Sequence, residues 1–413
     1  MKAPKLLGIV LAGGEGKRLL PLTEDRAKPA VPFGGHYRLI DFAISNLINS
    51  GLRQIVVLTQ YKSHSLDRHI SQVWRLSGML NAYVASVPAQ QRVGKRWFSG
   101  SADAIFQSLN LIGDERPDYV VVVGADHVYR MNFDQMLQEH IRTGAGVTVG
   151  GVPQPRNLAS QFGVIETSSA GDQRVTKFIE KPKKTNVISG DSDEIVASMG
   201  NYIFSTQTLI NSVREDSSNP KSSHDMGGDI VPSLVSRGDA YLYNLADNEI
   251  PGVSSSKPIY WSDVGTIDAF FQAHQDMVVA DPGFDLVNPD WPIFSQQWNV
   301  PPAKFLHDSR GSASVVEESI VALGSQILGG TIIGSVLGQW VSVGSRASIT
   351  NSILFDRVIV GADAEIQRAI IDKECRIGPG VRLGFDRKQD LARGLTLSPG
   401  GVTVAPKGTV INL

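Results

Sequence analysis

The sequence predicts an α/β domain with a mostly parallel sheet, followed by a parallel β-helix. Short apolar runs alternate with helical stretches through the first two-thirds of the 413-residue chain, which is typical of sheets built by crossover connections. Nearer the end, apolar residues and glycines return every 17 residues, which indicates the stacked coils of a β-helix. We expect domains over residues 1–284 and 313–413, joined by a linker over 285–312 that has no clear period.

Four apolar segments of the first domain predict buried strands. They are "LLGIVLA" (6–12), "QIVVLTQ" (54–60), "YVVVVGAD" (119–126) and "VTVGGV" (147–152). The first strand runs directly into a glycine-rich loop, and the third ends at Asp126. Because ligands of such sheets bind outside the carboxyl ends of the strands, this loop and Asp126 can share one cleft.

Helical periodicity fills the intervals between these strands. One helix is expected in "RLIDFAISNLINSG", with Gly51 as its C-cap, a second in "SADAIFQSLNLIGDE" and a third in "MLQEHIRTGAG". The apolar faces of the first two helices are Ile40, Ile44, Leu47 and Ile48, and Ala102, Ile105, Leu109 and Ile112.

The β-helix prediction rests on four registers that share one period. A sandwich of ordinary strands would not keep that register, whereas a β-helix repeats inward-pointing apolar residues and tight glycine corners at each turn. The registers are Val336, Ile353 and Ile370; Val343, Val360 and Ile377; Gly344, Gly361 and Gly378; and Ile349, Ile366 and Leu383.

Composition excludes several classes of protein. A net charge of −2 with 19% charged residues gives no reason to expect nucleic-acid or membrane-surface binding. The single cysteine, Cys375, rules out an internal disulfide and a cysteine metal cluster, which fits a reducing cytosol. The first apolar run reads as a buried strand rather than a signal peptide, and no stretch approaches the ~20 apolar residues of a membrane span. We expect a soluble, cytoplasmic protein.

The loop "LAGGEGKRLLPLTEDRAKPAVPFGG" (11–35) predicts a phosphate site. A dinucleotide fingerprint would need a third glycine at Leu19, and a P-loop would need a glycine at Leu11 and Ser or Thr after Lys17. What remains is a set of glycines whose backbone N–H groups can approach an anion, with charge added by Arg18, Arg26 and Lys28.

This loop resembles the signature of the sugar-phosphate nucleotidyltransferases: Gly-Gly-x-Gly-x-Arg-Leu, then Leu-Thr, then Lys-Pro. Further motifs resemble one branch, the bacterial glucose-1-phosphate adenylyltransferases, over nearly the whole chain. Those motifs are "TQYKSHSL", "PAQQR", "WFSGSADA", "GADHVY", "FGVIE", "FIEKP", "SMGNYIF", "SSHDMGGDIVP" and "YWSDVG". The resemblance implies a Rossmann-like, GT-A-like catalytic domain and a left-handed parallel β-helix for assembly and regulation. The implied reaction joins ATP and glucose 1-phosphate to give ADP-glucose and pyrophosphate, and supplies glycogen or a related α-glucan.

The resemblance also implies the roles of individual residues. Asp126 and Asp263 match the two aspartates that hold Mg²⁺, whose preferred ligands are hard oxygens. Arg18 and Lys28 are expected on the triphosphate and on the pyrophosphate leaving group, and Arg18, Lys28 and Asp126 form the expected catalytic set. The nucleotide site also includes Gly13, Gly14, Gly16 and Trp97, with either Gln90 or Gln91 reading the base.

The implied sugar-phosphate site draws on the later motifs. Lys181 matches the residue that grips the phosphate, Glu180 is expected to hold glucose hydroxyls, and Gly163 and Ser198 complete the site. Because neighbouring strand residues face opposite ways, Glu180 and Lys181 can share a ligand only if the strand ends there, as Pro182 suggests.

Regulation is implied in the same way. Relatives are tetramers controlled by sugar phosphates or related metabolites that bind between the domains, so we expect a homotetramer with such effectors. Enteric-type members have a basic pair before "AKPA", whereas this chain has Asp25-Arg26, which favours a monophosphate over a bisphosphate. Candidate effector contacts are Arg26, Arg38 and Lys373, and the residues expected to transmit activation are Gln60 and Trp97.

Three alternatives compete with this interpretation. Transfer from UTP, dTTP or GTP would keep the mechanism, but the branch-specific motifs favour ATP. An acyltransferase needs a catalytic histidine on the β-helix, and no histidine follows His307. A non-catalytic regulatory subunit would have no need of the complete set of metal and phosphate residues.

Overall fold

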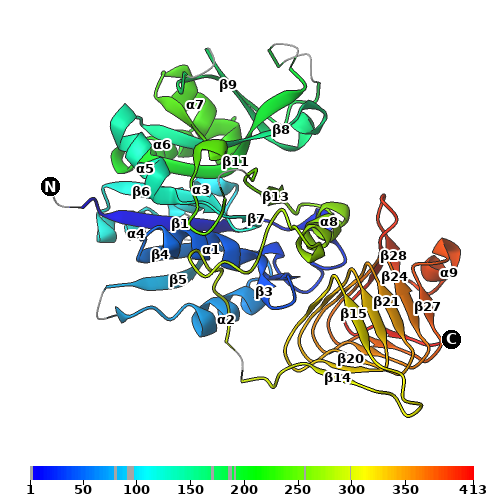
Figure 1. Cartoon of the computed structure of the whole chain (residues 1–413). Coiled ribbons are helices and arrows are strands. Elements are labelled where there is room, and N and C mark those ends of the chain that lie inside the picture. Colours follow the sequence, from blue (N-terminus) through cyan, green and yellow to red (C-terminus); the bar gives the residue numbers. More distant parts are fainter. Residues whose placement is uncertain are drawn as a thin grey trace.

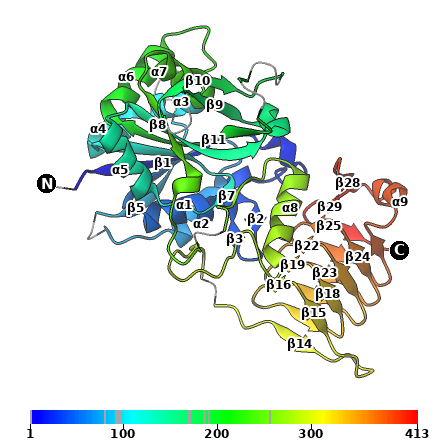
Figure 2. The same cartoon turned by 45° about the horizontal axis from the view of Figure 1, so that its top comes forward.

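The computed structural model describes residues 3–78, 81–90, 97–168, 172–184, 188–189, 192–254, 257–297 and 299–413. An α/β domain forms the N-terminal part of the chain, and a β-helix forms the C-terminal part (Figure 1). In both cartoon views the β-helix lies beside α8 (Ile267–Val278), the last helix of the α/β domain (Figure 2).

The central sheet is parallel in its first half. β1 (Leu6–Ala12) lies between β4 (Gln54–Thr59) and β6 (Tyr119–Gly124), and β5 (Tyr83–Pro88) borders β4. All of these neighbours pair in parallel, so their carboxyl ends meet at one edge of the sheet. The predicted first, second and third strands are thereby confirmed.

The second half of the sheet is largely antiparallel, so the sheet is mixed. β11 (Glu194–Ser205) pairs antiparallel with β6, β8 and β9, and β9 pairs antiparallel with β10, while β12 pairs in parallel with β8. The segment between β9 and β10 is too short for a crossover connection, so these two strands form a hairpin. Their bounds are β8 (Val147–Pro155), β9 (Gly163–Thr167), β10 (Val175–Glu180) and β12 (Ala240–Asn244).

The predicted helices form, with one change. α1 (Leu39–Asn49) buries its expected face and is followed by Gly51 at φ +89°, a conformation that glycine adopts without strain. The single helix expected over 101–115 is two helices, α3 (Ser101–Gln107) and α4 (Leu109–Glu115), because the backbone leaves the helical conformation at Ser108. The remaining α-helices before α8 are α2 (His64–Val73), α5 (Phe133–Thr143), α6 (Thr206–Ser217) and α7 (Val231–Ser236). Within the described part of the chain, no helix combines the length and apolar character that crossing a membrane requires.

The C-terminal part has three parallel sheets joined by short corners, the arrangement of the left-handed β-helix. The predicted period is confirmed, since Val336 pairs with Ile353 and then Ile370, and the other two strand registers pair likewise. Those other two registers line the interior of the coils as expected, whereas Ile353 and Ile370 point outward and pack against the α/β domain. The first sheet contains β14 (Lys304–Leu306), β17 (Gln326–Leu328), β20 (Ser342–Val343), β23 (Ile359–Val360), β26 (Arg376–Ile377) and β30 (Val410–Ile411). The second contains β15 (Val315–Glu317), β18 (Thr331–Ile333), β21 (Ser348–Thr350), β24 (Glu365–Gln367) and β27 (Arg382–Leu383). The third contains β16 (Ile320–Val321), β19 (Val336–Leu337), β22 (Ile353–Leu354), β25 (Ala369–Ile371), β29 (Thr403–Ala405) and β28 (Thr396–Leu397), and α9 (Arg387–Ala392) interrupts the coils before β28.

The β-helix starts earlier along the chain than its predicted bound. β14 lies in the segment expected to be linker, yet it pairs in parallel with β17 of the next coil. The 17-residue period can be recognised only where several complete coils follow one another. β14 belongs to the first coil, so it leaves no periodic signal in the sequence.

Two buried histidines are held neutral by the fold. His140 of α5 contacts the hydroxyls of Thr148 and Ser205, and burial lowers its pKa to about 4. His274 of α8 accepts the backbone N–H of Gly34 at Nε2 and bonds the carbonyl of Phe270 through Nδ1. Burial lowers the pKa of His274 to about 4 as well. In addition, a proton at Nε2 would face the N–H of Gly34.

Lowering the pH from 7.5 to 5.0 should therefore reduce the free energy of unfolding by about 2 kcal/mol for each of these histidines. Their folded pKa values lie below the ordinary value of 6.5, so the unfolded chain binds more protons and stability falls as the pH drops through about 6.5. Urea unfolding at both pH values measures this loss. The His274→Gln variant should lose less stability than the wild type, and replacing the exposed His307 by Gln should make no difference; equal losses in all three proteins would contradict the assignment.

Candidate active site

Two carboxylates meet where strands of the α/β domain end. Asp126 lies between β6 and β7 (His127–Tyr129), and Asp263 is the last residue of β13 (Trp261–Asp263). β13 pairs antiparallel with β7 so that Asp263 lies opposite His127. Ligand atoms of Asp126, His127 and Asp263 all lie within 4.8 Å of one another. Sequence analysis identified the two aspartates but not His127, although the motif "GADH" contains it.

Lys28 bridges the two carboxylates. Its Nζ lies 2.8 Å from Oδ2 of Asp126 and 3.3 Å from Oδ1 of Asp263, and its side chain is only 9% exposed. Burial opposes the charge of Lys28, yet the two carboxylates raise its pKa above the ordinary value. Burial likewise opposes the charge of Asp126, and Lys28, His127 and Arg18 hold its pKa well below the usual range. The site is therefore a charged cluster in which each group depends on its partners.

The residues present fit a divalent cation. Carboxylate oxygens are the donors that Mg²⁺ prefers. The ligand atoms of Asp126 and Asp263 lie within 4.8 Å of each other, which is close enough for both to bind one ion. Nε2 of His127 lies 3.7 Å from Oδ1 of Asp126 and 3.9 Å from Oδ1 of Asp263, and Nδ1 of the same ring is buried without a hydrogen-bond partner in the described part of the chain. The Lys28 ammonium would give up contacts to the carboxylates when a metal ion binds them.

A cavity of about 250 Å³ opens onto these carboxylates. Its lining contains all of the residues predicted for the metal and the sugar phosphate, together with neighbours that were not predicted. The predicted residues in its lining are Arg18, Asp126, Gly163, Glu180, Lys181, Ser198 and Asp263. The additional ones include Ser101, His127, Phe162, Tyr202, Asp225, Gly227 and Trp261.

The local backbone explains how Glu180 and Lys181 face one cavity. β10 ends at Glu180, and Lys181 adopts φ +42°, so the strand alternation stops where Pro182 predicted. The two side chains form an ion pair. A Cβ added at Gly163 or Gly227 would lie 2.9 Å from Oε2 of Glu180, so both glycines leave room for this carboxylate.

Two motifs far apart in the sequence form one wall of the cavity. The hydroxyl of Ser101 donates to Oδ2 of Asp225 at 2.8 Å and accepts the backbone N–H of Met226 at 2.8 Å. A Cβ at Gly100 would come within 2.2 Å of the carbonyl oxygen of His224, so only glycine permits this approach. The motifs "WFSGSADA" and "SSHDMGGD" are thus parts of one structure.

The opening loop reaches the cluster through Lys28 and Arg18. Gly16 adopts φ +66°, and Nη2 of Arg18 lies close to Gly265, beside the Asp263 carboxylate. Gly13 is partly buried near Gln60, and Gly14 is exposed, so backbone N–H groups of this loop are open to an anion.

The residues predicted for the base lie outside this cavity. Gln90 is exposed beyond the end of β5, and Gln91 is outside the described residues. Trp97 is 59% exposed, so it is not the packing anchor that a tryptophan usually forms. Gln60 accepts the backbone N–H of Phe98 at 2.8 Å and donates to its carbonyl at 3.4 Å, which ties the two predicted activation segments together.

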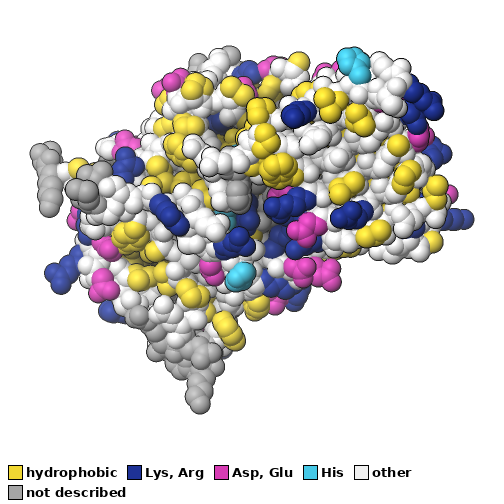
Figure 3. Space-filling view, turned by 90° about the horizontal axis from the view of Figure 1, so that it is seen from below, with side chains coloured by type: hydrophobic (Ala, Val, Ile, Leu, Met, Phe, Trp, Pro, Cys, Tyr) yellow, Lys and Arg dark blue, Asp and Glu magenta, His cyan; other side chains and the backbone are white. Residues whose placement is uncertain are grey.

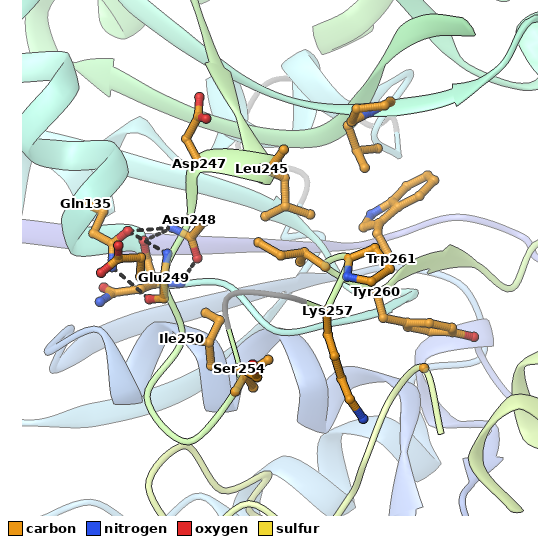
Figure 4. A pocket seen from close by; sticks show the side chains of 18 of the residues that line it. Gln135, Leu245, Asp247, Asn248, Glu249, Ile250, Ser254, Lys257, Tyr260 and Trp261 are labelled. Atoms are coloured by element: carbon orange, nitrogen blue, oxygen red, sulfur yellow. Dashed lines mark hydrogen bonds between the residues drawn. The ribbon is translucent and has the colours of Figure 1, made fainter. Parts of the chain in front are cut away.

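A larger cavity, about 1380 Å³, lies elsewhere, between β8 and residues of the stretches 245–254 and 257–261 (Figure 4). It shares Trp261 with the smaller cavity but none of the predicted site residues. Gln135 in its wall accepts hydrogen bonds from Asn248 and from the backbone N–H of Glu249. Among the described residues of the lining, Lys257 is the single cation, beside Glu194, Asp247 and Glu249, so the cavity lacks the convergent positive charge that phosphate chemistry requires.

A third cavity, about 290 Å³, lies between the α/β domain and the β-helix. Burial lowers the pKa of both Arg38 and Lys373 there, although Asp356 lies 2.5 Å from Nζ of Lys373. Lys and Arg side chains gather near the middle of the face seen from below, with Asp and Glu beside them (Figure 3). The basic and histidine residues of the lining are Arg38, His64, Arg68, His69, Arg357 and Lys373.

Arg26 is absent from that lining, although it was predicted as an effector contact. Its Nη2 lies 2.8 and 2.7 Å from the two carboxylate oxygens of Asp372, and both side chains are buried. A buried guanidinium needs a paired carboxylate, and here the partner is 346 residues away in the β-helix. Arg26 therefore joins the two domains.

Comparisons with known proteins agree with this arrangement. A family model described as "Nucleotidyl transferase" matches residues 7–279, and one described as "GlmU-like, C-terminal hexapeptide" matches residues 301–405. The chain is 58% identical over 404 residues to the glucose-1-phosphate adenylyltransferase of Leifsonia xyli subsp. xyli (strain CTCB07), covering 98% of each chain. It is 52% identical over 411 residues to that of Bifidobacterium longum (strain DJO10A), covering 100% of this chain and 99% of the relative. It is 53% identical over 412 residues to that of Parafrankia sp. (strain EAN1pec), covering 100% of both chains.

Replacing Lys28 by Met should strengthen the binding of Mn²⁺ alone about tenfold. The variant removes the cation that competes for the Asp126 and Asp263 carboxylates, and an attractive site for a divalent ion remains. Electron paramagnetic resonance of free Mn²⁺ measures the dissociation constant. Lys17→Met, at an exposed lysine of the same loop, is the matched control; weaker or unchanged binding by the Lys28 variant would contradict competition at this site.

Proposed function

The chain belongs to the glucose-1-phosphate adenylyltransferase family of nucleotidyltransferases, and we propose that it catalyses the formation of ADP-glucose in the 250 Å³ cavity. A phosphate oxygen of glucose 1-phosphate attacks the α-phosphorus of ATP, the bond from that phosphorus to the bridging oxygen breaks, and pyrophosphate leaves. The observation that carries the assignment is the Lys28–Asp126–Asp263 cluster at the mouth of a cavity that also holds Glu180 and Lys181.

Charge neutralisation is the main task of this site, because both substrates are anions. When bound at Asp126 and Asp263, Mg²⁺ would offset the charge of the phosphate oxygens. Lys28 and Arg18 reach the cluster from the opening loop, and they would hold the triphosphate and the departing pyrophosphate. Positioning and electrostatic stabilisation supply most of the rate in such transfers.

The other site residues divide between the two substrates. Lys181 would hold the sugar phosphate, while Glu180, Ser198 and Gly163 would shape the pocket for the glucose ring. Ser198 and Tyr202 stand on either side of a register shift in β11, and both line the cavity, where a ligand would meet them. For the nucleotide, we assign the glycines 13, 14 and 16 to the phosphates, and the base to Trp97 with Gln90 or Gln91.

The junction cavity supports a regulatory role. Its surplus of positive charge suits a phosphorylated metabolite, and Arg38 and Lys373 are the contacts we assign to it. Gln60, which is bonded to the segment after Trp97, would carry the effect toward the nucleotide. We further propose a cytoplasmic homotetramer, as the family resemblance implies.

The function is tested by pyrophosphate release from glucose 1-phosphate and Mg²⁺ with ATP, UTP, dTTP or GTP. We expect a strong preference for ATP, and an at least ~100-fold lower kcat for Asp126→Asn, because the variant loses a charge at the reacting phosphates. Asp134→Asn, at an exposed aspartate of α5, is the matched control. Preference for another nucleotide would keep the mechanism and change the pathway, whereas no release with any nucleotide would favour a regulatory subunit.

The regulatory role is tested with hexose monophosphates as activators. Lys373→Gln should raise the concentration for half-maximal activation about tenfold, the effect of losing one charge-assisted contact. Steady-state assays over an activator series measure it, with Lys388→Gln on α9 as the control. Unchanged activation in Lys373→Gln, or a preference for fructose 1,6-bisphosphate, would contradict the assignment.

A further inference from the structure

A hairpin of the β-helix contacts the helix that follows the metal-binding strand. β28 and β29 pair antiparallel, unlike the other strands of their sheet, and they lie beside α8 (Figures 1 and 2). The turn of this hairpin spans Ser398 to Gly401 and is closed by hydrogen bonds between Ser398 and Val402 and between Gly401 and Ser398. The turn points one hydroxyl and one backbone N–H at α8.

Both of these donors bind the same carboxylate, that of Asp268 in the first turn of α8. The hydroxyl of Ser398 donates to Oδ1 at 2.5 Å, and the backbone N–H of Gly400 donates to Oδ2 at 3.1 Å. A Cβ at Gly400 would lie 2.4 Å from Oδ1, so the turn approaches as closely as glycine allows. Hydrogen bonds to an ionised carboxylate are about twice as strong as neutral ones.

An arginine holds the other side of the turn. Arg368 donates to the carbonyl of Gly400 at 3.1 Å, and its guanidinium lies 5.3 Å from the ring centroid of Phe271, also in α8. The turn is thus held between the β-helix and two residues of one helical turn of α8. Its position relative to that helix is fixed from both sides.

The first turn of α8 is directly connected to the metal cluster. Thr266 caps the helix, and only Val264 and Gly265 separate it from Asp263. A Cβ at Gly265 would lie 3.0 Å from the Asp263 carboxylate and 3.2 Å from Nη2 of Arg18, so the backbone just before α8 lies close to both groups. The apolar residues beside the site belong to the same cluster as the outward-facing residues of the β-helix that pack against the α/β domain. They are Leu19, Val128, Val264, Ile267 and Phe271 from the α/β domain, and Ile353, Phe355, Ile370, Val402 and Val404 from the β-helix.

We propose that Asp268 is a positioning residue for the reaction: its bonds to the β28–β29 turn hold Asp263 and Arg18 in the geometry that binds metal and phosphate. This inference rests on the proposed function, in which Asp263 is a metal ligand. The β-helix would then support catalysis directly, through a contact separate from the basic junction cavity. A contact that served only to join the domains would affect stability and leave metal affinity unchanged.

The test compares Ser398→Ala and Asp268→Asn with Ser314→Ala in the full-length chain. Ser314 is the matched control, because its hydroxyl bonds main-chain groups of the β-helix, donating to the carbonyls of Leu306 and Ile327 and accepting the N–H of Gly329. We expect the dissociation constant of Mn²⁺ alone to rise about three- to tenfold in the first two variants, the effect of losing a bond to a charged group. The Mg²⁺ concentration for half-maximal pyrophosphate release should rise by the same factor, with the KM for glucose 1-phosphate unchanged.

Mn²⁺ affinities equal to those of the wild type and Ser314→Ala would overturn the proposal, as would undetectable Mn²⁺ binding by the wild type. If the wild type binds Mn²⁺ but releases no pyrophosphate with any nucleotide, the proposed function fails and the Mn²⁺ comparison still decides the role of Asp268. Should Asp268→Asn fail to fold, Ser398→Ala and Gly400→Ala alter the same contact from the β-helix side and decide it.

Discussion

The ion pairs of Lys28 with Asp126 and Asp263 are the interaction on which the site depends. They join a loop after the first strand to residues 98 and 235 positions further along the chain. Two neighbouring carboxylates repel each other, and an unpaired buried ammonium costs several kcal/mol. The carboxylate pair and the Lys28 ammonium therefore stabilise each other. In the function we propose, a metal ion would replace the Lys28 ammonium at the two carboxylates, and the ammonium would then bind phosphate oxygens.

The fold around this cluster connects the α/β domain to the β-helix. Parallel strands β1 and β6 deliver the loop and Asp126 to one sheet edge, and the β7–β13 ribbon adds Asp263. The side chains packed beneath these groups do not form a core of their own. They share one apolar cluster with the β-helix, while Arg26 and Asp372 add a buried ion pair across the same junction. A change in the junction therefore has a physical route to the reacting groups.

Sequence reasoning reached the features that depend on local pattern. Strand ends, the period of the coils and the end of β10 at Glu180 all follow from neighbouring residues, so they could be predicted. Features that depend on distant partners could not. The pairing of Arg26 with Asp372 and the exposure of Trp97 are set by tertiary contacts that leave no periodic signal. His127 carried a usable signal, since it follows a strand-ending aspartate, but its place opposite Asp263 required the β7–β13 pairing.

We propose that metal and phosphate bind where Lys28 bridges Asp126 and Asp263. Crystals of the chain grown with Mn²⁺ and ADP-glucose would test it most directly, through the anomalous scattering of manganese. We expect a manganese ion bound by the carboxylates of Asp126 and Asp263, with Nζ of Lys28 moved away from at least one of them. Manganese bound elsewhere, with both Lys28 ion pairs intact and ADP-glucose in the cavity, would contradict it.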